Sequence, residues 1–327
     1  MKNNLKNRYV IGVHVMYFEI EMFEEYIDGL FNLLNTVENK ENIMLDFCFN
    51  TSEHLEQIDT SQISKEELIS KFDTQIARLK GYNCKVNYHD TDDGFYYHAD
   101  YRRDLNYNYC KKVDYIMWGE TDSFFPKEAF QAIESLSEYT RTNGIHRFIM
   151  SFADRKMWDS SWDPLVHPKF EKHVFVDDEN GHLNPNQAKS QMSIERMNEI
   201  NAESKEFDFT YIQQPKISGS CLVLSSDIIK AGVNVPLCLI YNDDEGLSIM
   251  SKIVLGNNFI QFICKNILHV HARRHAKKRL YVMDENNPHS FAPQKNDTFK
   301  RFKEMSQANI ANLIQNKNKF YEYEDFK

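Results

Sequence analysis

VDYIMWGETDSFFPKEAF, residues 113–130, begins with an apolar run and then places two carboxylates, Glu120 and Asp122, with one residue between them. The apolar run predicts a strand that is buried on both faces, as strands of parallel sheets are. In open α/β sheets, ligands bind beyond the carboxyl ends of the strands. The two carboxylates are therefore predicted to lie at the edge of a sheet where such ligands bind.

Segments with the pattern of strands alternate with segments of helical spacing on both sides of this stretch. Predicted strands cover residues 8–18, 43–50, 84–90, 113–119 and 146–152, and predicted helices cover residues 21–34, 64–80, 100–112 and 126–138. Alternation of this kind is typical of an α/β fold with a mainly parallel sheet flanked by helices. We therefore expect one such sheet, covered on both faces.

The alternation stops after residue 152 and returns after residue 216. Residues 153–216 have the pattern of an insertion with one helix, near residues 187–204. Beyond it, a strand is predicted at residues 217–229, a loop at residues 241–253 and a strand at residues 259–275. We expect residues 1–275 to form a single domain that contains this insertion.

Length and composition favour one large globular domain. The chain has 327 residues, of which 42% are hydrophobic, enough to bury a sizeable core. Six cysteines without a CxxC pair favour free thiols in a reducing compartment. No segment is apolar for long enough to span a bilayer, and the N-terminal apolar stretch lacks the cleavage site of a signal peptide. A cytoplasmic protein is expected.

The formal net charge of −9 disfavours indiscriminate binding to nucleic acids or anionic membranes. The segment HVHARRHAKKR, residues 269–279, departs from this average because it holds five basic residues and three histidines. Two interpretations of this segment stay open at the level of sequence. It forms either a site for a local anionic partner or a solvated basic face.

The spacing of Glu120 and Asp122 suits a divalent cation. Carboxylates two positions apart in an extended turn can point to the same side, and a hard cation takes carboxylate oxygens together with phosphates and waters. Such a pair can hold a metal against a diphosphate. The alternative is structural, because Asp122 or Ser123 can cap the helix that is predicted to begin near Pro126.

The turn Glu120-Thr121-Asp122 resembles the metal-binding DxD motif of GT-A glycosyltransferases, with Glu in the first position. Further short motifs follow in the order of that family over residues 8–275. The resemblance implies a Rossmann-like GT-A sheet with a nucleotide-sugar half (1–152), an acceptor-side insertion (153–216), an acceptor half (217–275) and a C-terminal helical extension (276–327). It also implies metal-dependent transfer of a sugar from a nucleotide diphosphate sugar, a UDP-sugar, to an acceptor hydroxyl.

The resemblance further implies roles for individual residues. Donor binding falls to Tyr17, Asp46, Arg102, Arg103, Gly119, Thr121 and Gly219; Mn²⁺ or Mg²⁺ binding falls to Glu120, Asp122 and either His269 or His271; the proton acceptor of an inverting enzyme falls to Asp244 or Glu245. Structural interpretations stay open for several of them. Acidic residues in NDDEG, residues 242–246, are also typical of a helix N-terminus, and the two arginines can pair with acids on their own helix.

Two other classes of protein compete with a glycosyltransferase. A nucleotidyltransferase should carry glycine and basic residues in its first loop, but that loop here is MYFEIEMFEE, residues 16–25. A noncatalytic carbohydrate-binding protein is favoured only by the aromatic content, including Trp158 and Trp162. For a glycosyltransferase the acceptor is either a glycan or, because of the basic segment 269–279, a hydroxymethylated base in DNA.

Overall fold

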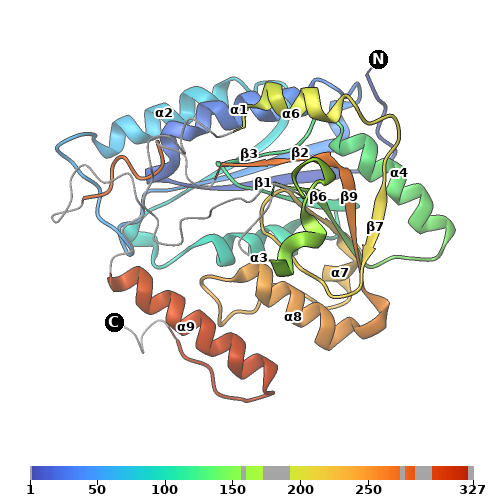
Figure 1. Ribbon diagram of the computed structural model, residues 1–327. Coiled ribbons are helices and arrows are strands. Elements are labelled where there is room, and N and C mark those ends of the chain that lie inside the picture. Colours follow the sequence, from blue (N-terminus) through green and yellow to red (C-terminus); the bar gives the residue numbers. More distant parts are fainter. Residues whose placement is uncertain (1, 156–159, 172–191, 273–276, 284–296, 323–327) are drawn as a thin grey trace.

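A computed structural model of the protein describes residues 2–155, 160–171, 192–272, 277–283 and 297–322 (Figure 1). The strands of the main sheet are β1 (Tyr9–Met16), β2 (Ile43–Asn50), β3 (Asn83–His89), β4 (Tyr115–Gly119), β6 (Phe148–Ala153), β7 (Phe209–Ile212), β8 (Leu222–Ser225) and β9 (Ile260–Leu268). They lie in the order β3-β2-β1-β4-β8-β6-β9-β7. The pairs β1-β2, β2-β3, β1-β4 and β6-β9 are parallel, and the other pairs are antiparallel. The predicted mainly parallel sheet is confirmed.

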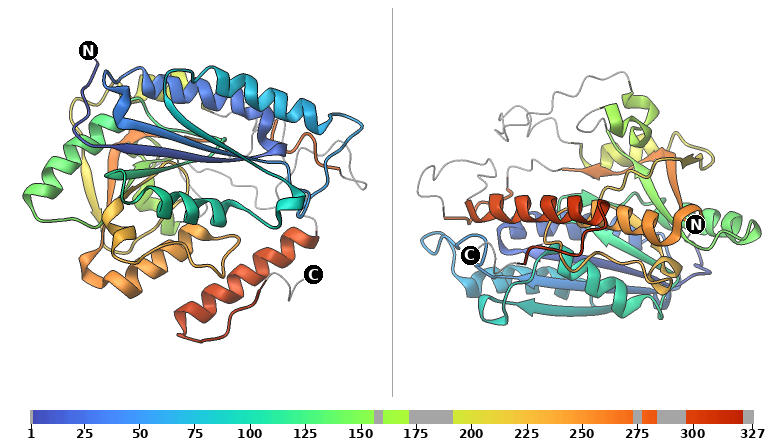
Figure 2. Two further views of the ribbon diagram at one scale, coloured as in Figure 1. Left: turned by 180° about the vertical axis from the view of Figure 1, so that it is seen from behind. Right: turned by 90° about the horizontal axis from the view of Figure 1, so that it is seen from below.

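Helices cover both faces of this sheet, as the views in Figures 1 and 2 show. One face carries α1 (Ile20–Leu34), α2 (Lys65–Ala77), α4 (Ala129–Thr142) and α6 (Ile194–Asn201). The other face carries α3 (His98–Tyr109), α7 (Ser226–Lys230) and α8 (Asp243–Leu255). Helix α9 (Asp297–Ile314) packs against α8. Short 3-10 helices are η1 (Tyr17–Glu19), η2 (Lys40–Asn42), η3 (Thr91–Asp93), η4 (Ser160–Leu165), η5 (Pro168–Phe170) and η6 (Gly256–Asn258). Flanking helices on both faces confirm the predicted layering.

Strand β4 contributes its side chains alternately to two hydrophobic cores, one on each face. Tyr115 and Met117 belong to the core with α1, whereas Ile116 and Trp118 belong to the core with α3. All five residues of the strand are buried. Because neither face of β4 contacts water, its sequence is apolar without alternation.

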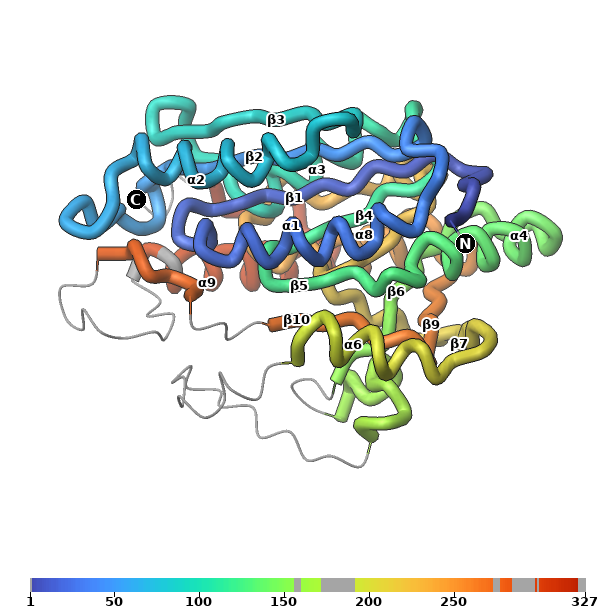
Figure 3. The backbone as a smooth tube through the Cα atoms, turned by 90° about the horizontal axis from the view of Figure 1, so that it is seen from above, coloured from blue at the N-terminus to red at the C-terminus, as the bar shows by residue number. Residues whose placement is uncertain are grey.

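A second sheet of two short antiparallel strands lies beside the first (Figure 3). It consists of β5 (Ser123–Phe124) and β10 (Val270–His271), with Ser123 opposite His271. This pairing joins the segment that follows β4 to the segment that follows β9. It brings together residues that are about 150 positions apart in the sequence.

The predicted elements of residues 1–152 all occur, with ends that shift by a few residues. In the second half, the strand predicted at residues 217–229 is confirmed only over β8, Leu222–Ser225. The Ser225 side chain accepts a hydrogen bond from the Asp227 N–H and starts helix α7. Helix α8 occupies most of the predicted loop 241–253. Strand β7 was not predicted, because a four-residue edge strand with exposed side chains leaves little pattern in the sequence.

The insertion is partly built into the fold. Helix α6 packs on β9, and β7 extends the main sheet at its edge. The predicted helix 187–204 is confirmed over residues 194–201, and residues 187–191 lie outside the described part of the chain. The domain boundaries at residues 152, 216 and 275 stay predictions.

The six cysteines are free thiols. None of the helices in the described ranges combines the length and the apolar character that crossing a bilayer requires. Placement in the cytoplasm stays a prediction.

Candidate active site

Three side chains of metal-ligand type meet at the carboxyl end of β4. His271 Nε2 lies 3.4 Å from Glu120 Oε2 and 3.6 Å from Asp122 Oδ1. One ligand atom of each residue lies within 4.8 Å of the other two, and within the described residues this is the one group of this kind. The structure therefore brings together three of the four predicted metal ligands.

Backbone hydrogen bonds hold these three residues in place. The Ser123 N–H donates to the Glu120 carbonyl oxygen at 3.0 Å and closes the turn after β4. The Ala272 N–H donates to the Asp122 carbonyl oxygen at 2.6 Å, beside the β5-β10 pairing that sets His271 opposite Ser123. The position of the histidine thus depends on sheet pairing rather than on side-chain packing alone.

The three donor atoms fit a divalent cation. Two carboxylate oxygens and one imidazole nitrogen are ligands that Mn²⁺ accepts readily, and the carboxylates also suit Mg²⁺. Burial raises the pKa of Glu120, and the Asp122 carboxylate raises it further, while the Arg102 guanidinium lowers it. A cation between the carboxylates would offset this repulsion. The residues present are therefore compatible with the metal that the resemblance implies.

His269 does not join this group. Its Nδ1 lies 3.1 Å from the Ala153 carbonyl oxygen, and its Nε2 lies 3.3 Å from the Ser220 hydroxyl oxygen. Its backbone N–H also donates to the Ala153 carbonyl oxygen, at 2.8 Å, so that His269 stays attached to the end of β6. The chain then leaves the main sheet, and of these two histidines it is His271 that reaches the carboxylates.

Lys278 provides a second, unpredicted contact to the carboxylates. Its ammonium lies 2.8 Å from Asp122 Oδ2 and 3.2 Å from Glu19 Oε1. Glu19 is 4% exposed, and this burial raises its pKa, although Lys278 lowers it. The lysine thus orients one oxygen of Asp122 and leaves the other facing His271.

The basic segment 269–279 is not a continuous basic surface. Lys278 pairs with Asp122 and Glu19, and Arg279 pairs with the buried Glu56. Arg273 and Arg274 lie outside the described residues. Because Lys278 and Arg279 pair with protein carboxylates, they support neither a surface for an anionic partner nor a solvated basic face.

Arg102 connects the metal-ligand group to the first turn of α8. Its guanidinium donates to Glu120 Oε1 and Asp243 Oδ2, both at 2.5 Å, and to the Gly219 carbonyl oxygen at 3.0 Å. Its charge also lies 4.7 Å above the ring of Trp118. A side chain at position 219 would collide with this guanidinium, which explains the glycine. Both terminal nitrogens of Arg102 donate to protein groups, and its predicted contact with the diphosphate stays a prediction.

The Arg102→Lys variant should lose this bridge. A lysine ammonium cannot bind two carboxylates and a carbonyl in the planar arrangement of a guanidinium. We expect the free energy of unfolding to fall by about 3 kcal/mol, since buried carboxylates lose their partner. The control is Arg78→Lys, because Arg78 pairs with Asp28 at the surface and should change stability by less than about 1 kcal/mol. Urea denaturation tests this, and equal stability of the two variants would contradict the bridging role.

Arg103 and Asp46, which were predicted to bind the nucleotide sugar, form contacts within the protein, and their roles in donor binding stay predictions. Arg103 donates to the carbonyl oxygens of Val235 and Pro236 and pairs with Asp100, as the structural interpretation had it. The Asp46 carboxylate accepts hydrogen bonds from tyrosine hydroxyls of α3 at 2.7 and 3.1 Å. Asp46 lies opposite Gly12 in the middle of the sheet, four positions before the end of β2. Burial raises its pKa.

Tyr17, Gly119 and Thr121 lie at the carboxyl ends of β1 and β4. Tyr17 is fully buried, and its hydroxyl has no hydrogen-bond partner among the described residues. Gly119 leaves no room for a side chain, because a Cβ atom would meet the Tyr26 hydroxyl and Val13. Thr121 is 1% exposed. Gly119 thus has a packing role, and donor contacts for Tyr17 and Thr121 stay predictions.

Asp244 lies in the first turn of α8, next to the Arg102 bridge. Its Oδ2 accepts a hydrogen bond from the Gly219 N–H at 3.2 Å, and its Oδ1 accepts one from the Glu245 N–H at 2.8 Å. Burial, and then the Asp243 carboxylate, raise the pKa of Asp244 to about 7, although Arg102 lowers it. Glu245 is exposed and accepts a hydrogen bond from the Asn242 side chain at 3.1 Å. Of the two predicted proton acceptors, Asp244 is the one with a perturbed environment.

Two histidines that the sequence did not single out, His14 and His98, form a chain of hydrogen bonds with Asn50. The Asn50 Oδ1 accepts from the Ser52 N–H at 2.8 Å, so the Asn50 amide nitrogen is the group that lies 3.2 Å from His14 Nε2. His14 Nε2 is then an acceptor, and its proton is on Nδ1, 3.4 Å from His98 Nδ1. His98 must therefore accept at Nδ1 and carry its proton on Nε2.

This arrangement makes His98 a neutral hydrogen-bond donor. Burial lowers the pKa of His98 to about 3, and the charges of Arg102 and Lys278 lower it further, while Asp122 raises it. No described residue accepts a hydrogen bond from Nε2. A sequence signal was available, because HADYRR, residues 98–103, puts a histidine at the start of the helix before the metal strand.

The sequence matches no protein-family model and no curated protein. The fold, in contrast, has relatives among solved structures. GalNAc-T7, crystallised with UDP, GalNAc and Mn²⁺, superposes with a TM-score of 0.51 over 92% of this chain and 51% of that chain, at 11% identity. The chain has a GT-A fold.

A second solved structure, M. tuberculosis glucosyl-3-phosphoglycerate synthase, covers 97% of this chain and 83% of that chain with a TM-score of 0.43 and 10% identity. This chain spans about half the length of the GalNAc-T7 chain. At such identities the similarity concerns the GT-A fold and not the reaction.

Proposed function

We propose that the protein is a metal-dependent glycosyltransferase that moves a sugar from a nucleotide diphosphate sugar to an acceptor hydroxyl. The observation that carries this proposal is the convergence of Glu120, Asp122 and His271 at the carboxyl end of β4 in a GT-A fold. A carboxyl group of raised pKa, Asp244, lies on the far side of the Arg102 bridge. The site thus combines a place for a cation with a group that can accept a proton.

Each part of the site has a separate task in this reaction. Glu120, Asp122 and His271 would hold Mn²⁺ or Mg²⁺, which neutralises the leaving diphosphate when it is bound. Lys278 and Arg102 fix the two carboxylates from the other side, so that their oxygens keep one orientation. The neutral N–H group of His98 can donate a hydrogen bond to an oxygen of the nucleotide sugar.

Asp244 is the proposed proton acceptor. In its ionised form it can take the proton of the acceptor hydroxyl while the bond to the sugar forms. A pKa of about 7 keeps a large part of the group ionised at neutral pH and still allows it to hold a proton. This role requires inversion at the anomeric carbon.

The competing classes lack comparable support. The connection from β1 to α1 is the 3-10 helix η1 (Tyr17–Glu19), without the glycine and basic residues of a nucleotidyltransferase loop. A noncatalytic carbohydrate-binding protein does not require a metal-ligand group beside a carboxyl of raised pKa. DNA as acceptor has lost the support of Lys278 and Arg279, because both pair with protein carboxylates.

Hydrolysis of the donor in the absence of any acceptor tests the proposed function. Because the solved GalNAc-T7 structure holds UDP and Mn²⁺, UDP-sugars with Mn²⁺ come first, followed by GDP-sugars and Mg²⁺. We expect slow release of the nucleoside diphosphate, which chelation of the metal by EDTA abolishes. If calorimetry detects no binding of any nucleotide sugar and no nucleotide is released, the proposed function is wrong.

A further inference from the structure

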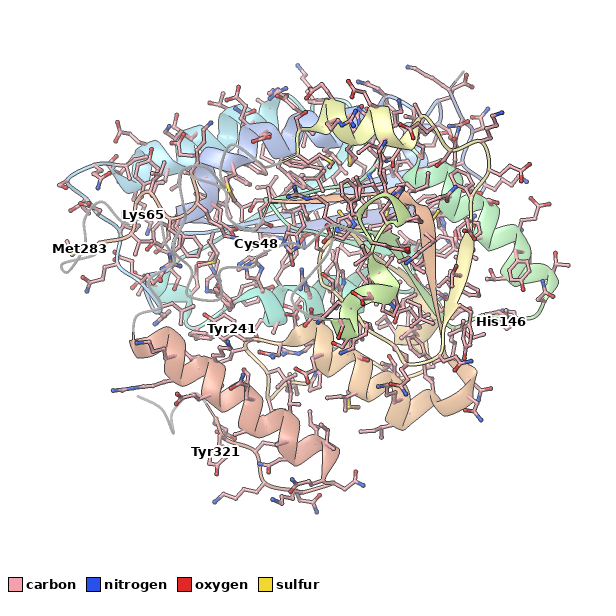
Figure 4. The ribbon with its side chains drawn as sticks, in the orientation of Figure 1. Cys48, Lys65, His146, Tyr241, Met283 and Tyr321 are labelled. Carbon is pink, nitrogen blue, oxygen red and sulfur yellow. The ribbon has the colours of Figure 1, made fainter. Side chains whose placement is uncertain are left out.

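A cavity of about 820 Å³ lies on the face of the molecule that α8 and α9 form. Its lining includes Trp162 of η4, Lys216, Lys252 and Lys303, and it reaches Asp244. Figure 4 labels Tyr241, a further lining residue, just before α8 and above α9. The volume is that of a small-molecule site.

Three lysines outnumber the two carboxylates of the cavity wall, Asp244 and Glu245, and point to a ligand with an anionic group. Lys216, Lys252 and Lys303 come from three different segments, and none of them forms an ion pair with a carboxylate of the described residues. Lys216 and Lys303 are half-buried, so their charges are partly removed from water. The Lys216 ammonium is positioned by the Ser161 hydroxyl at 3.1 Å and by the ring of Trp162 at 5.2 Å. A lysine ammonium can form charge-assisted hydrogen bonds with a carboxylate or phosphate group.

The inner end of the cavity lies next to the proposed proton acceptor. Asp244 belongs to the lining and is joined through Gly219 to Arg102, which in turn contacts Glu120. A ligand in the cavity can therefore place a hydroxyl at Asp244 while an anionic group of the same ligand meets the lysines. Ile217 and the aromatic side chains provide apolar surface for the ring of a sugar.

We propose that this cavity binds the acceptor and that the acceptor is a saccharide with a carboxylate or phosphate group. The role of this saccharide as acceptor rests on the proposed glycosyl transfer. The preference for anionic saccharides is a property of the cavity alone. It can therefore be measured without any nucleotide sugar.

The test is calorimetric titration of the full chain with three probes: glucuronate, glucose 6-phosphate and glucose. We expect one or both anionic sugars to bind at least tenfold more tightly than glucose, and the better of the two identifies the anionic group. Lys216→Gln and Lys303→Gln should each weaken that binding by roughly tenfold, since each removes a charged hydrogen bond. Glucose binding should not change. The matched control is Lys230→Gln, a surface lysine that pairs with Asp227 on α7 and should bind like the wild type.

Three outcomes would overturn the inference. The first is equal affinity for glucose and both anionic sugars, and the second is tight anion binding that the Lys216 and Lys303 variants leave unchanged. The third is displacement of a bound anionic sugar by a short DNA duplex, because it would assign the cavity to nucleic acid. Donor hydrolysis is measured separately, so its absence beside a clear preference for anionic sugars would reject the transferase and retain the cavity.

Discussion

The Asp122→Asn variant is expected to lose metal-dependent turnover by on the order of a thousandfold, which corresponds to about 4 kcal/mol of transition-state stabilisation. Asp122 contributes one oxygen to the group with Glu120 and His271, and it is 4% exposed. Asparagine keeps the shape of the side chain and an oxygen for Lys278, but it removes the charge that attracts a cation. Donor hydrolysis with saturating Mn²⁺ measures the loss, and calorimetry measures the metal affinity.

The control for this variant is Asp28→Asn. Asp28 lies on α1, is more than half exposed and pairs with Arg78 at the surface, so its loss should leave turnover and metal affinity unchanged. Thermal unfolding of both variants in EDTA verifies that each one folds. An Asp122→Asn protein with near-wild-type turnover would sink the metal assignment at the end of β4.

The Asp244→Asn variant is expected to slow transfer by on the order of a hundredfold or more, because an amide cannot accept the proton of the attacking hydroxyl. Its effect should also depend on pH. Since the pKa of Asp244 is raised to about 7, the carboxyl is protonated and inactive well below this value and ionised above it. Wild-type turnover should rise with pH up to about 7 and then level off, and the variant should lose this rise.

Glu245→Gln is the matched control for Asp244→Asn. The two carboxyl groups are neighbours in the first turn of α8, but Glu245 is exposed and contacts Asn242 rather than Gly219. We expect its turnover to stay within about threefold of the wild type, because no reacting group depends on its charge. If Glu245→Gln removes turnover and the pH dependence instead, the roles of the two residues must be exchanged.

The sequence by itself determined the central part of the fold. Strand β4 contributes side chains to two cores, so neither of its faces contacts water. A strand buried on both faces is a continuous apolar run, and such a run can be recognised in the sequence without knowledge of the neighbouring strands. The position of Glu120 and Asp122 follows from the same fact, because a run that ends in carboxylates marks the carboxyl edge of the sheet. Local signals of this kind predicted the main-sheet strands and the α-helices of residues 1–152, but not the short strand β5 or the 3-10 helices.

Only the tertiary structure decided which neighbours in the sequence share the site. Arg102 and Arg103 are adjacent, but successive residues of a helix point about 100° apart, so one reaches Glu120 and the other reaches the loop before α8. His269 and His271 also have different surroundings although they are close in sequence. His269 bonds to Ala153 of β6 in the main sheet, whereas His271 belongs to β10. The partners of Lys278 and the lysines of the cavity come from segments far apart in the chain. Contacts of that kind depend on sheet pairing and helix packing, and no local pattern in the sequence records them.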